Sequence, residues 1–99
     1  MPDNSLYQHL AGEAGKITWQ ELQPHFARGV LVVVSDSLDL IEVATRIAQD
    51  DRDVVARWTS EGHVIKASDD HARCWTLSNP LLYAVVVAPW VLVQLPPRH

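Results

Sequence analysis

His71 and Cys74 come nearest to a chemical site in this 99-residue sequence. They stand three positions apart, so a helix would place both side chains on one face. An imidazole and a thiol so placed are suited to binding a metal, with His63 or Asp70 as further ligands, or to activating the thiol as a nucleophile. A structural zinc site needs four ligands, however, and a single cysteine offers no second pair. We therefore expect no metal and no catalytic residue here, and interpret Cys74 as a small, half-buried hydrophobic residue.

The segment from Pro24 to Gly29 holds a second candidate. His25 and Arg28 lie near the expected end of a helix, where an imidazole and a cation are suited to binding an anion or a partner's carboxylate. The alternative is structural, because positive groups near a helix C-terminus complement the helix dipole and glycine commonly ends helices. The structural interpretation is favoured, and both residues are kept as candidates for an interaction site.

Trp90 is the third candidate. The other tryptophans, Trp19, Trp58 and Trp75, lie on apolar faces of expected helices, where packing in the core explains them. Trp90 instead follows Pro89 at an expected bend in the last strand, and an exposed aromatic residue in an apolar run is typical of an interface anchor. It predicts strand-edge pairing or dimerisation through the C-terminal segment, with burial under the first helix as the alternative.

Motifs of common enzyme classes are absent from the sequence. It has no Gly-x-Ser-x-Gly turn, no glycine-rich phosphate loop, no dinucleotide fingerprint and no paired-histidine zinc motif. Its four glycines are not clustered, which argues against a nucleotide enzyme. We expect no cofactor, and an enzyme is disfavoured.

The elements that must position these candidates follow from hydrophobic spacing and end signals. Thr18 and Glu21 have the spacing of a capping box, Asp36 or Ser37 is expected to cap the helix after the first strand, and Gly62 is placed to end a helix. Pro89 is expected at an edge, bulge or corner. We expect helices near residues 5–15, 18–29, 37–48, 51–62 and 68–78, and strands near residues 30–34, 63–67, 82–87 and 91–95.

This order predicts one α+β domain over residues 1–99, with a winged-helix-like helix pair, a small and mainly antiparallel sheet, and an inserted helix at residues 68–78. A two-layer α+β sandwich is the alternative. Winged helices often bind DNA through phosphate contacts of basic residues. Residues 36–61, which would form the binding face, hold seven acidic and three basic residues. Nucleic-acid binding is therefore disfavoured.

Composition indicates where such a domain works. Apolar residues make up 47% of the chain, and the single cysteine fits a reducing compartment. The start of the chain lacks the basic and apolar regions of a secretory signal. The unbroken apolar run at residues 81–93 is 13 residues long, where a membrane span needs about 20. We expect a cytoplasmic protein that does not enter the membrane.

Five segments together resemble one family. They are Trp19-x-Glu21-Leu22, His25-Phe26-Ala27-Arg28-Gly29, Leu38-Asp39-Leu40, Val43-Ala44 and Val85-Val86-Val87-x-Pro89-Trp90-Val91-Leu92-x-Gln94. Over nearly its whole length the sequence is similar to a small bacterial family catalogued as domain of unknown function 2288. The resemblance implies no activity, and it favours His25, Arg28 and Trp90 as the residues to test.

The leading hypothesis is a non-enzymatic module that binds an unknown protein partner or self-associates through Trp90, with His25 and Arg28 as further candidates. A DNA-associated regulator with a winged-helix fold is the second hypothesis, which the acidic helix pair opposes. A small metal or thiol protein that uses His71 and Cys74 is the third.

Overall fold

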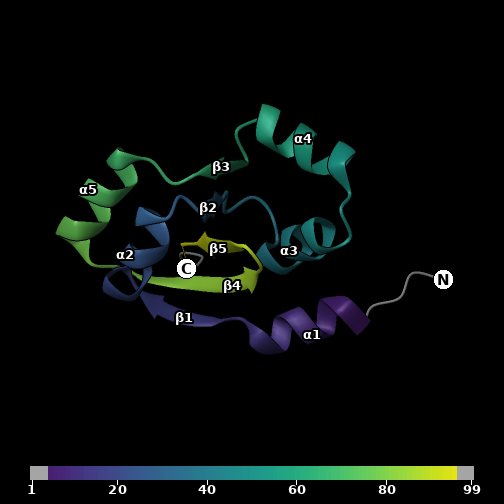
Figure 1. Ribbon diagram of the computed structural model, residues 1–99, viewed down its shortest axis with the longest axis horizontal. Coiled ribbons are helices and arrows are strands. Elements are labelled where there is room, and N and C mark those ends of the chain that lie inside the picture. Colours follow the sequence, from purple (N-terminus) through teal and green to yellow (C-terminus); the bar gives the residue numbers. More distant parts are fainter. Residues whose placement is uncertain (1–4, 96–99) are drawn as a thin grey trace.

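One mixed sheet forms the middle of the molecule, and helices lie against both of its faces (Figure 1). The computed structural model describes residues 5–95. In this range the elements are α1 (Ser5–Glu13), β1 (Gly15–Thr18), α2 (Trp19–Ala27), β2 (Leu31–Val34), α3 (Leu40–Ala48), α4 (Arg52–Ser60), β3 (Val64–Lys66), α5 (Asp69–Ser78), β4 (Leu81–Val87) and β5 (Trp90–Gln94). The expected α+β class and the mainly antiparallel sheet are confirmed.

The strand order is β1-β4-β5-β2-β3, so β5 is the middle strand. β2 and β5 run parallel, with Leu31 opposite Val91, and the other neighbouring strands are antiparallel. A strand with neighbours on both sides and helices on both faces is buried along its length, which explains why β5 reads as a continuous apolar run.

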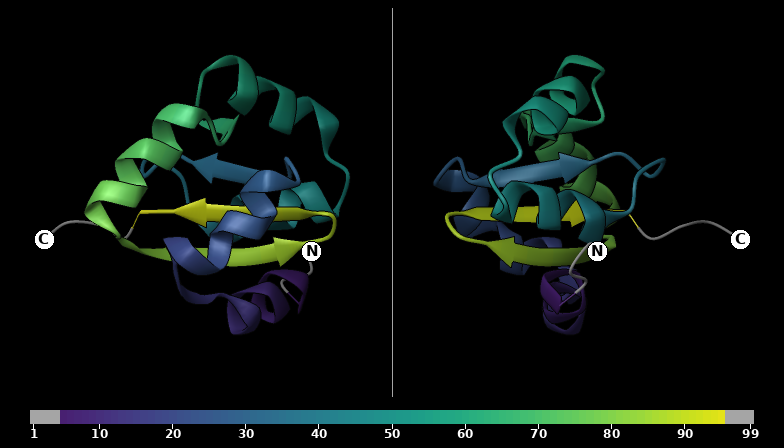
Figure 2. Two further views of the ribbon diagram at one scale, coloured as in Figure 1. Left: turned by 60° about the vertical axis from the view of Figure 1, so that its left-hand side comes forward. Right: turned by 90° about the vertical axis from the view of Figure 1, so that its right-hand side faces the viewer.

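Alternating side chains of the strands enter two separate cores. On one face, Val32, Val85 and Leu92 pack with Leu10 of α1 and with α3. The core of the opposite face consists of residues from α2, α5 and the strands: Trp19, Leu22, Leu31, Trp75, Leu82, Val91 and Val93. In the left view of Figure 2, α2 passes in front of the strands and α3 lies behind them. The domain therefore has three layers, and the two-layer alternative is wrong.

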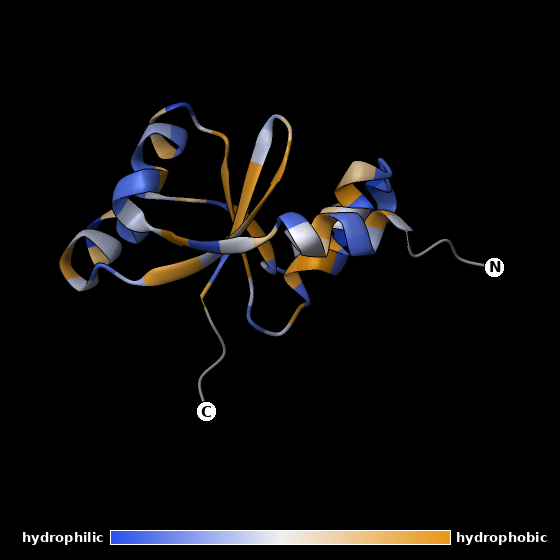
Figure 3. Cartoon of the chain, turned by 90° about the horizontal axis from the view of Figure 1, so that it is seen from below, coloured by the Kyte–Doolittle hydropathy of each residue, from blue (hydrophilic) through white to orange (hydrophobic). Residues whose placement is uncertain are grey.

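Hydropathy follows these layers. Seen from below, the strands are mostly apolar and lie between two groups of helices whose colours alternate between apolar and polar (Figure 3). Between α2 and α5, the rings of Trp19 and Trp75 meet edge to face with centroids 5.4 Å apart. The indole nitrogen of Trp19 donates a hydrogen bond of 3.0 Å to the hydroxyl of Thr76. Such aromatic pairs add to the stabilisation from buried area, so this face is tightly closed.

Local signals explain most helix ends. The Thr18 side chain accepts a hydrogen bond from the backbone N–H of Glu21, as the capping-box spacing predicts. Gly29 and Gly62 have positive φ angles of 75° and 79°, a conformation that favours glycine. The expected cap of α3 is wrong: Asp39, rather than Asp36 or Ser37, caps it by accepting a hydrogen bond of 3.0 Å from the N–H of Ile41.

The C-terminal segment is a hairpin. Val87 pairs with Trp90, so Ala88 and Pro89 form the connection between β4 and β5. Pro89 therefore lies at a corner, as expected from its missing N–H. Because β5 pairs with β4 and β2, it has no free edge, and the prediction of strand-edge pairing through the Trp90 segment is wrong.

The winged-helix likeness is not confirmed. The α3, α4 and β3 succession exists, but β3 is the outer strand of a five-stranded sheet, and α2 and α5 cover the face opposite to α3. The sequence also did not indicate β1, because its four residues Gly15–Thr18 lie between two helix signals. The predicted helix order was right, whereas the layers depend on strand pairing, which local signals do not determine.

Candidate functional site

α4 lies at one side of the molecule, above α3 and β3 (Figure 1). None of its side chains is fully buried, and Val54, Val55 and Trp58 are half-buried. Its neighbour α3, by contrast, buries Leu40, Val43, Ala44 and Thr45. α4 therefore packs less closely than α3, and a space remains between this helix and the sheet.

This space is an apolar groove of about 240 Å³, which we call the α4 groove. Residues of α3, α4 and three strands line it: Val32, Ile47, Val55, Thr59, Val64, Ile65, Lys66 and Trp90. Strand pairing explains why strand residues far apart in the sequence meet there. Val32 lies opposite Lys66 in the β2–β3 pair, and Trp90 begins β5, which runs parallel to β2. Val32 and Trp90 both face the core beneath α3.

Trp90 and Lys66 lie next to each other in the lining of the α4 groove. The Lys66 ammonium nitrogen lies 5.7 Å from the centroid of the Trp90 ring, which is within the range of a cation–π contact. Trp90 is half-buried and packs against the core, while Lys66 is exposed. Within residues 5–95 the ammonium group of Lys66 has no ion pair with a carboxylate. The groove thus presents a cation above an apolar floor.

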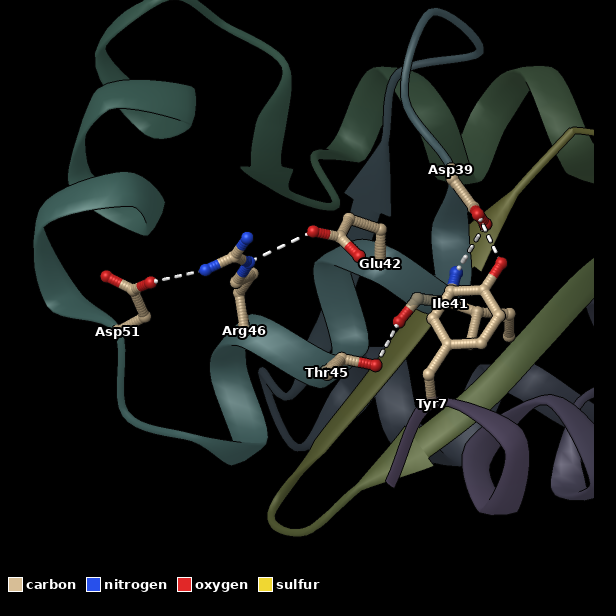
Figure 4. A network of polar contacts seen from close by, with 7 residues as sticks. All are labelled: Tyr7, Asp39, Ile41, Glu42, Thr45, Arg46 and Asp51. Atoms are coloured by element: carbon tan, nitrogen blue, oxygen red, sulfur yellow. Dashed lines mark hydrogen bonds and ion pairs between the residues drawn. The ribbon is translucent and has the colours of Figure 1, made fainter. Parts of the chain in front are cut away.

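A polar network joins α4 to α3 (Figure 4). The Arg46 guanidinium donates hydrogen bonds of 3.0 Å to both Glu42 of α3 and Asp51, the residue before α4. The hydrogen bonds that Arg46 donates to Glu42 and Asp51, together with the negative charges of these carboxylates, raise the pKa of Arg46, with Glu42 the larger cause. Asp51 makes no side-chain capping bond to α4, so its carboxylate serves this ion pair rather than the amides of the helix.

Tyr7 extends the network to α1. Its hydroxyl donates a hydrogen bond to the carboxylate of Asp39, the cap residue of α3 (Figure 4). This hydrogen bond, with partial burial and the nearby negative charges, raises the pKa of Tyr7. These contacts join α1 and α4 to α3, and the half-buried Trp58 also packs α4 against the core beneath α3.

His25 and Arg28 lie beside a different groove. The Arg28 guanidinium is 3.5 Å from Nδ1 of His25, a long hydrogen bond between exposed groups. His25, Glu21 and Val86 help to line a groove of about 230 Å³ next to α2. Val86 and Trp90 belong to the same hairpin but face opposite sides of the sheet, because their neighbours Ala84 and Leu92 belong to different cores. The structure therefore does not bring His25 into the α4 groove.

The residues of the metal or thiol hypothesis have local roles. Nδ1 of His71 accepts a hydrogen bond of 3.0 Å from the Ser68 N–H and completes the capping box of α5. Nδ1 of His63 is 3.4 Å from the Ser37 hydroxyl. Cys74 is exposed, so its interpretation as half-buried is wrong. Across the described residues, no three potential metal ligands of the His, Cys, Asp or Glu types cluster to hold an ion.

Sequence reasoning singled out Trp90 but missed Lys66 and Thr59. Neither has a special local pattern: Lys66 ends the three-residue strand β3, and Thr59 lies in the polar helix α4. The available signal was the low number of apolar residues in α4, since such a helix cannot bury a full face.

The fold and the groove together define an α+β domain with a partly open apolar site beneath one helix. The sequence pattern of the family described as protein of unknown function DUF2288 matches residues 5–95. The chain belongs to this family, which confirms the resemblance of its sequence.

A solved relative has the same fold. The chain is similar to PA1075 from Pseudomonas aeruginosa, whose solution structure was determined by NMR, with 48% sequence identity and a TM-score of 0.83. The likeness covers 97% of this chain and 89% of that one. Comparison with curated proteins finds no match. None of the helices at residues 5–95 is long and apolar enough to cross a membrane.

Proposed function

We propose that this domain is a non-enzymatic binding module that takes an apolar part of a partner protein into the α4 groove. The observation that carries the proposal is the seating of α4, which leaves Val55 half-buried beside an open apolar cavity. Anchors of protein interfaces are commonly large side chains in such pockets, where aromatic residues such as tryptophan are enriched. Trp90 supplies this aromatic residue here, with Lys66 over its ring.

The size of the groove favours a protein side chain over a metabolite. Sites for drug-sized ligands and cofactors usually enclose about 300–1,000 Å³ and surround most of the ligand. The α4 groove has about 240 Å³ and is open to solvent on one side. It is therefore suited to one bulky apolar group that a larger surface holds in place.

The edges of the sheet support the groove as the binding surface. β1 and β3, the outer strands, have four and three residues, and each carries an exposed lysine, Lys16 and Lys66. Short edges with lysine oppose pairing with a further strand. Sheet extension is thus a poorer route to association than docking beside α4.

A DNA-associated role has less support. Asp50 and Asp53 lie at the start of α4, the helix that would enter a DNA groove, and they would repel phosphates.

As part of the proposal we place the module in the cytoplasm, which the unpaired cysteine supports because reducing compartments keep thiols free.

A pair of neighbouring substitutions tests the proposal. Thr59→Arg would place a long charged side chain at the groove, whereas Ser60→Arg adds the same side chain to the same helix outside the groove lining. Both positions are exposed, so both variants should fold, which circular dichroism and thermal melting would verify. The native protein and the two variants would be immobilised and exposed to lysate of the organism that encodes the chain.

We expect the native protein and Ser60→Arg to retain the same partner and Thr59→Arg to lose it. Sedimentation analysis over a range of concentrations tests whether the partner is a second copy of this chain. In that case the apparent mass of the native protein and of Ser60→Arg would rise with concentration, and that of Thr59→Arg would not. Equal retention by all three proteins would contradict the proposal.

A further inference from the structure

We propose that the α4 groove recognises a peptide segment in which a bulky apolar side chain stands next to a carboxylate. This inference rests on the proposed function and specifies the partner's chemistry. Its basis is charge complementarity within the groove: Lys66 is the one charged residue among those that line the cavity, and the remaining residues are apolar except Thr59.

The Lys66 ammonium group is available to an incoming anion. It lies over the Trp90 ring, a contact that holds it at the groove while leaving its outer side open to solvent. It forms no ion pair with any carboxylate of the described chain. A carboxylate placed there would gain a charge-assisted hydrogen bond without displacing an existing partner.

The cations at the other end of α4 are already engaged. Arg46 binds Glu42 and Asp51, and Arg52 lies 3.2 Å from a carboxylate oxygen of Asp50. A neighbouring hollow at this end is lined by Asp50, Asp51 and Arg52 and shares Ile47 and Val55 with the α4 groove. Lys66 is thus the charged residue that an acidic residue of the partner meets at the α4 groove itself, which sets the direction of the bound segment.

The apolar contact and the charge contribute unequally to the affinity. Burial of an aliphatic side chain against Val32, Val55 and Val64 supplies most of the affinity. An exposed ion pair with Lys66 contributes less, because solvent screens it. We therefore expect the acid to improve binding by about two- to fivefold.

Nuclear magnetic resonance titration of the ¹⁵N-labelled native protein with three capped hexapeptides tests this inference. Each peptide contains one leucine in an alanine background, followed by glutamate, glutamine or lysine. We expect shifts at the amides of Val55 and Lys66 and at the Trp90 indole, with affinity falling from the glutamate to the glutamine to the lysine peptide. Decanoate is a fourth probe, which offers an apolar chain and a carboxylate without a peptide.

Two variants and a control separate charge from shape. Lys66→Gln should remove the preference for glutamate over glutamine, and Lys66→Glu should reverse the order of the glutamate and lysine peptides. Lys16→Gln removes an exposed lysine from the opposite edge strand and should leave all affinities unchanged.

The other possible results of the titration would overturn the inference or its acidic preference. Equal binding of the three peptides in the groove would overturn the acidic preference and leave the proposed function standing. Stronger binding of decanoate than of the glutamate peptide, or no shift at the groove with any peptide at millimolar concentration, would overturn the inference. Failure of the proposed function is read separately, from equal partner retention by Thr59→Arg and Ser60→Arg.

Discussion

α3 and α4 are consecutive helices of nine residues each, yet the protein uses them differently. α3 has four buried residues, and Val43 and Ala44 are completely inaccessible to solvent. α4 has none, and Arg46 and Asp51 connect it to α3 by an ion pair in which both side chains are partly exposed. The difference teaches that adjacent helices of equal length can be placed differently: α3 completes the core, and α4 forms a wall of the groove for which we propose binding.

The largest expected effect is in α3. Leu40→Ala removes a side chain that is 4% exposed and leaves a cavity in the core beneath α3. We expect the free energy of unfolding to fall by about 2–4 kcal/mol. Urea denaturation followed by circular dichroism measures it, and a loss below about 1 kcal/mol would show that α3 is not the structural helix.

The corresponding change in α4 should matter less. Val55→Ala shortens a half-buried side chain beside an open groove, so it creates no closed cavity. We expect a loss of about 1 kcal/mol or less, with the denaturant slope unchanged. The same denaturation series checks this value, and a loss equal to that of Leu40→Ala would abolish the contrast between the two helices.

Arg46→Gln should loosen α4 more than α3. The substitution removes the ion pair with Asp51 before α4 and the pair with Glu42 within α3. We expect amide hydrogen exchange to become much faster in residues 52–60 and to change little in residues 40–48, because buried apolar contacts hold α3. Raised salt should produce the same pattern in the native protein, since salt screens exposed pairs. Uniform acceleration in both helices would refute a separate role for the ion pair.

The smallest effect concerns the link from α1 to α3. Tyr7→Phe removes the hydrogen bond to Asp39 and should cost about 0.5–1 kcal/mol at neutral pH. The pKa of Tyr7 is raised in the folded protein, so its contribution is complete below the ordinary tyrosine pKa of about 10 and disappears as the pH rises through the folded value.

Denaturation of the native and Tyr7→Phe proteins at pH 7, 9 and 11 would test this sign. The difference in unfolding free energy between the two should be constant from pH 7 to 9 and should shrink at pH 11. A difference that grows with pH would contradict the assigned hydrogen bond.

Much of the secondary structure was predictable because its signals are local. Thr18 with Glu21 predicted the cap at the start of α2 and Gly62 predicted the end of α4, and the structure confirms both. The short strand β1 was missed because four residues between two helices carry too little periodicity. Asp36, Ser37 and Asp39 all have side chains suited to capping α3, and only the backbone geometry selects Asp39.

The candidate site was predictable only in part. Trp90 was singled out because an aromatic residue after proline in an apolar run is unusual, although the expected edge pairing was wrong. Its use in binding stays a prediction, as does that of His25 and Arg28. Lys66 and Thr59 carry no local signal, since a lysine or a threonine on an exposed position is ordinary.

By itself, the sequence determined the succession of helices and strands, most of their ends and the α+β class, because hydrophobic spacing, caps and glycines act over a few residues. Only the tertiary structure decided the strand order, the three layers and the meeting of Lys66, Thr59 and Trp90 around one groove. The reason is physical: β2 pairs with β5 across about three fifths of the chain, and such long-range pairing depends on how the whole core packs.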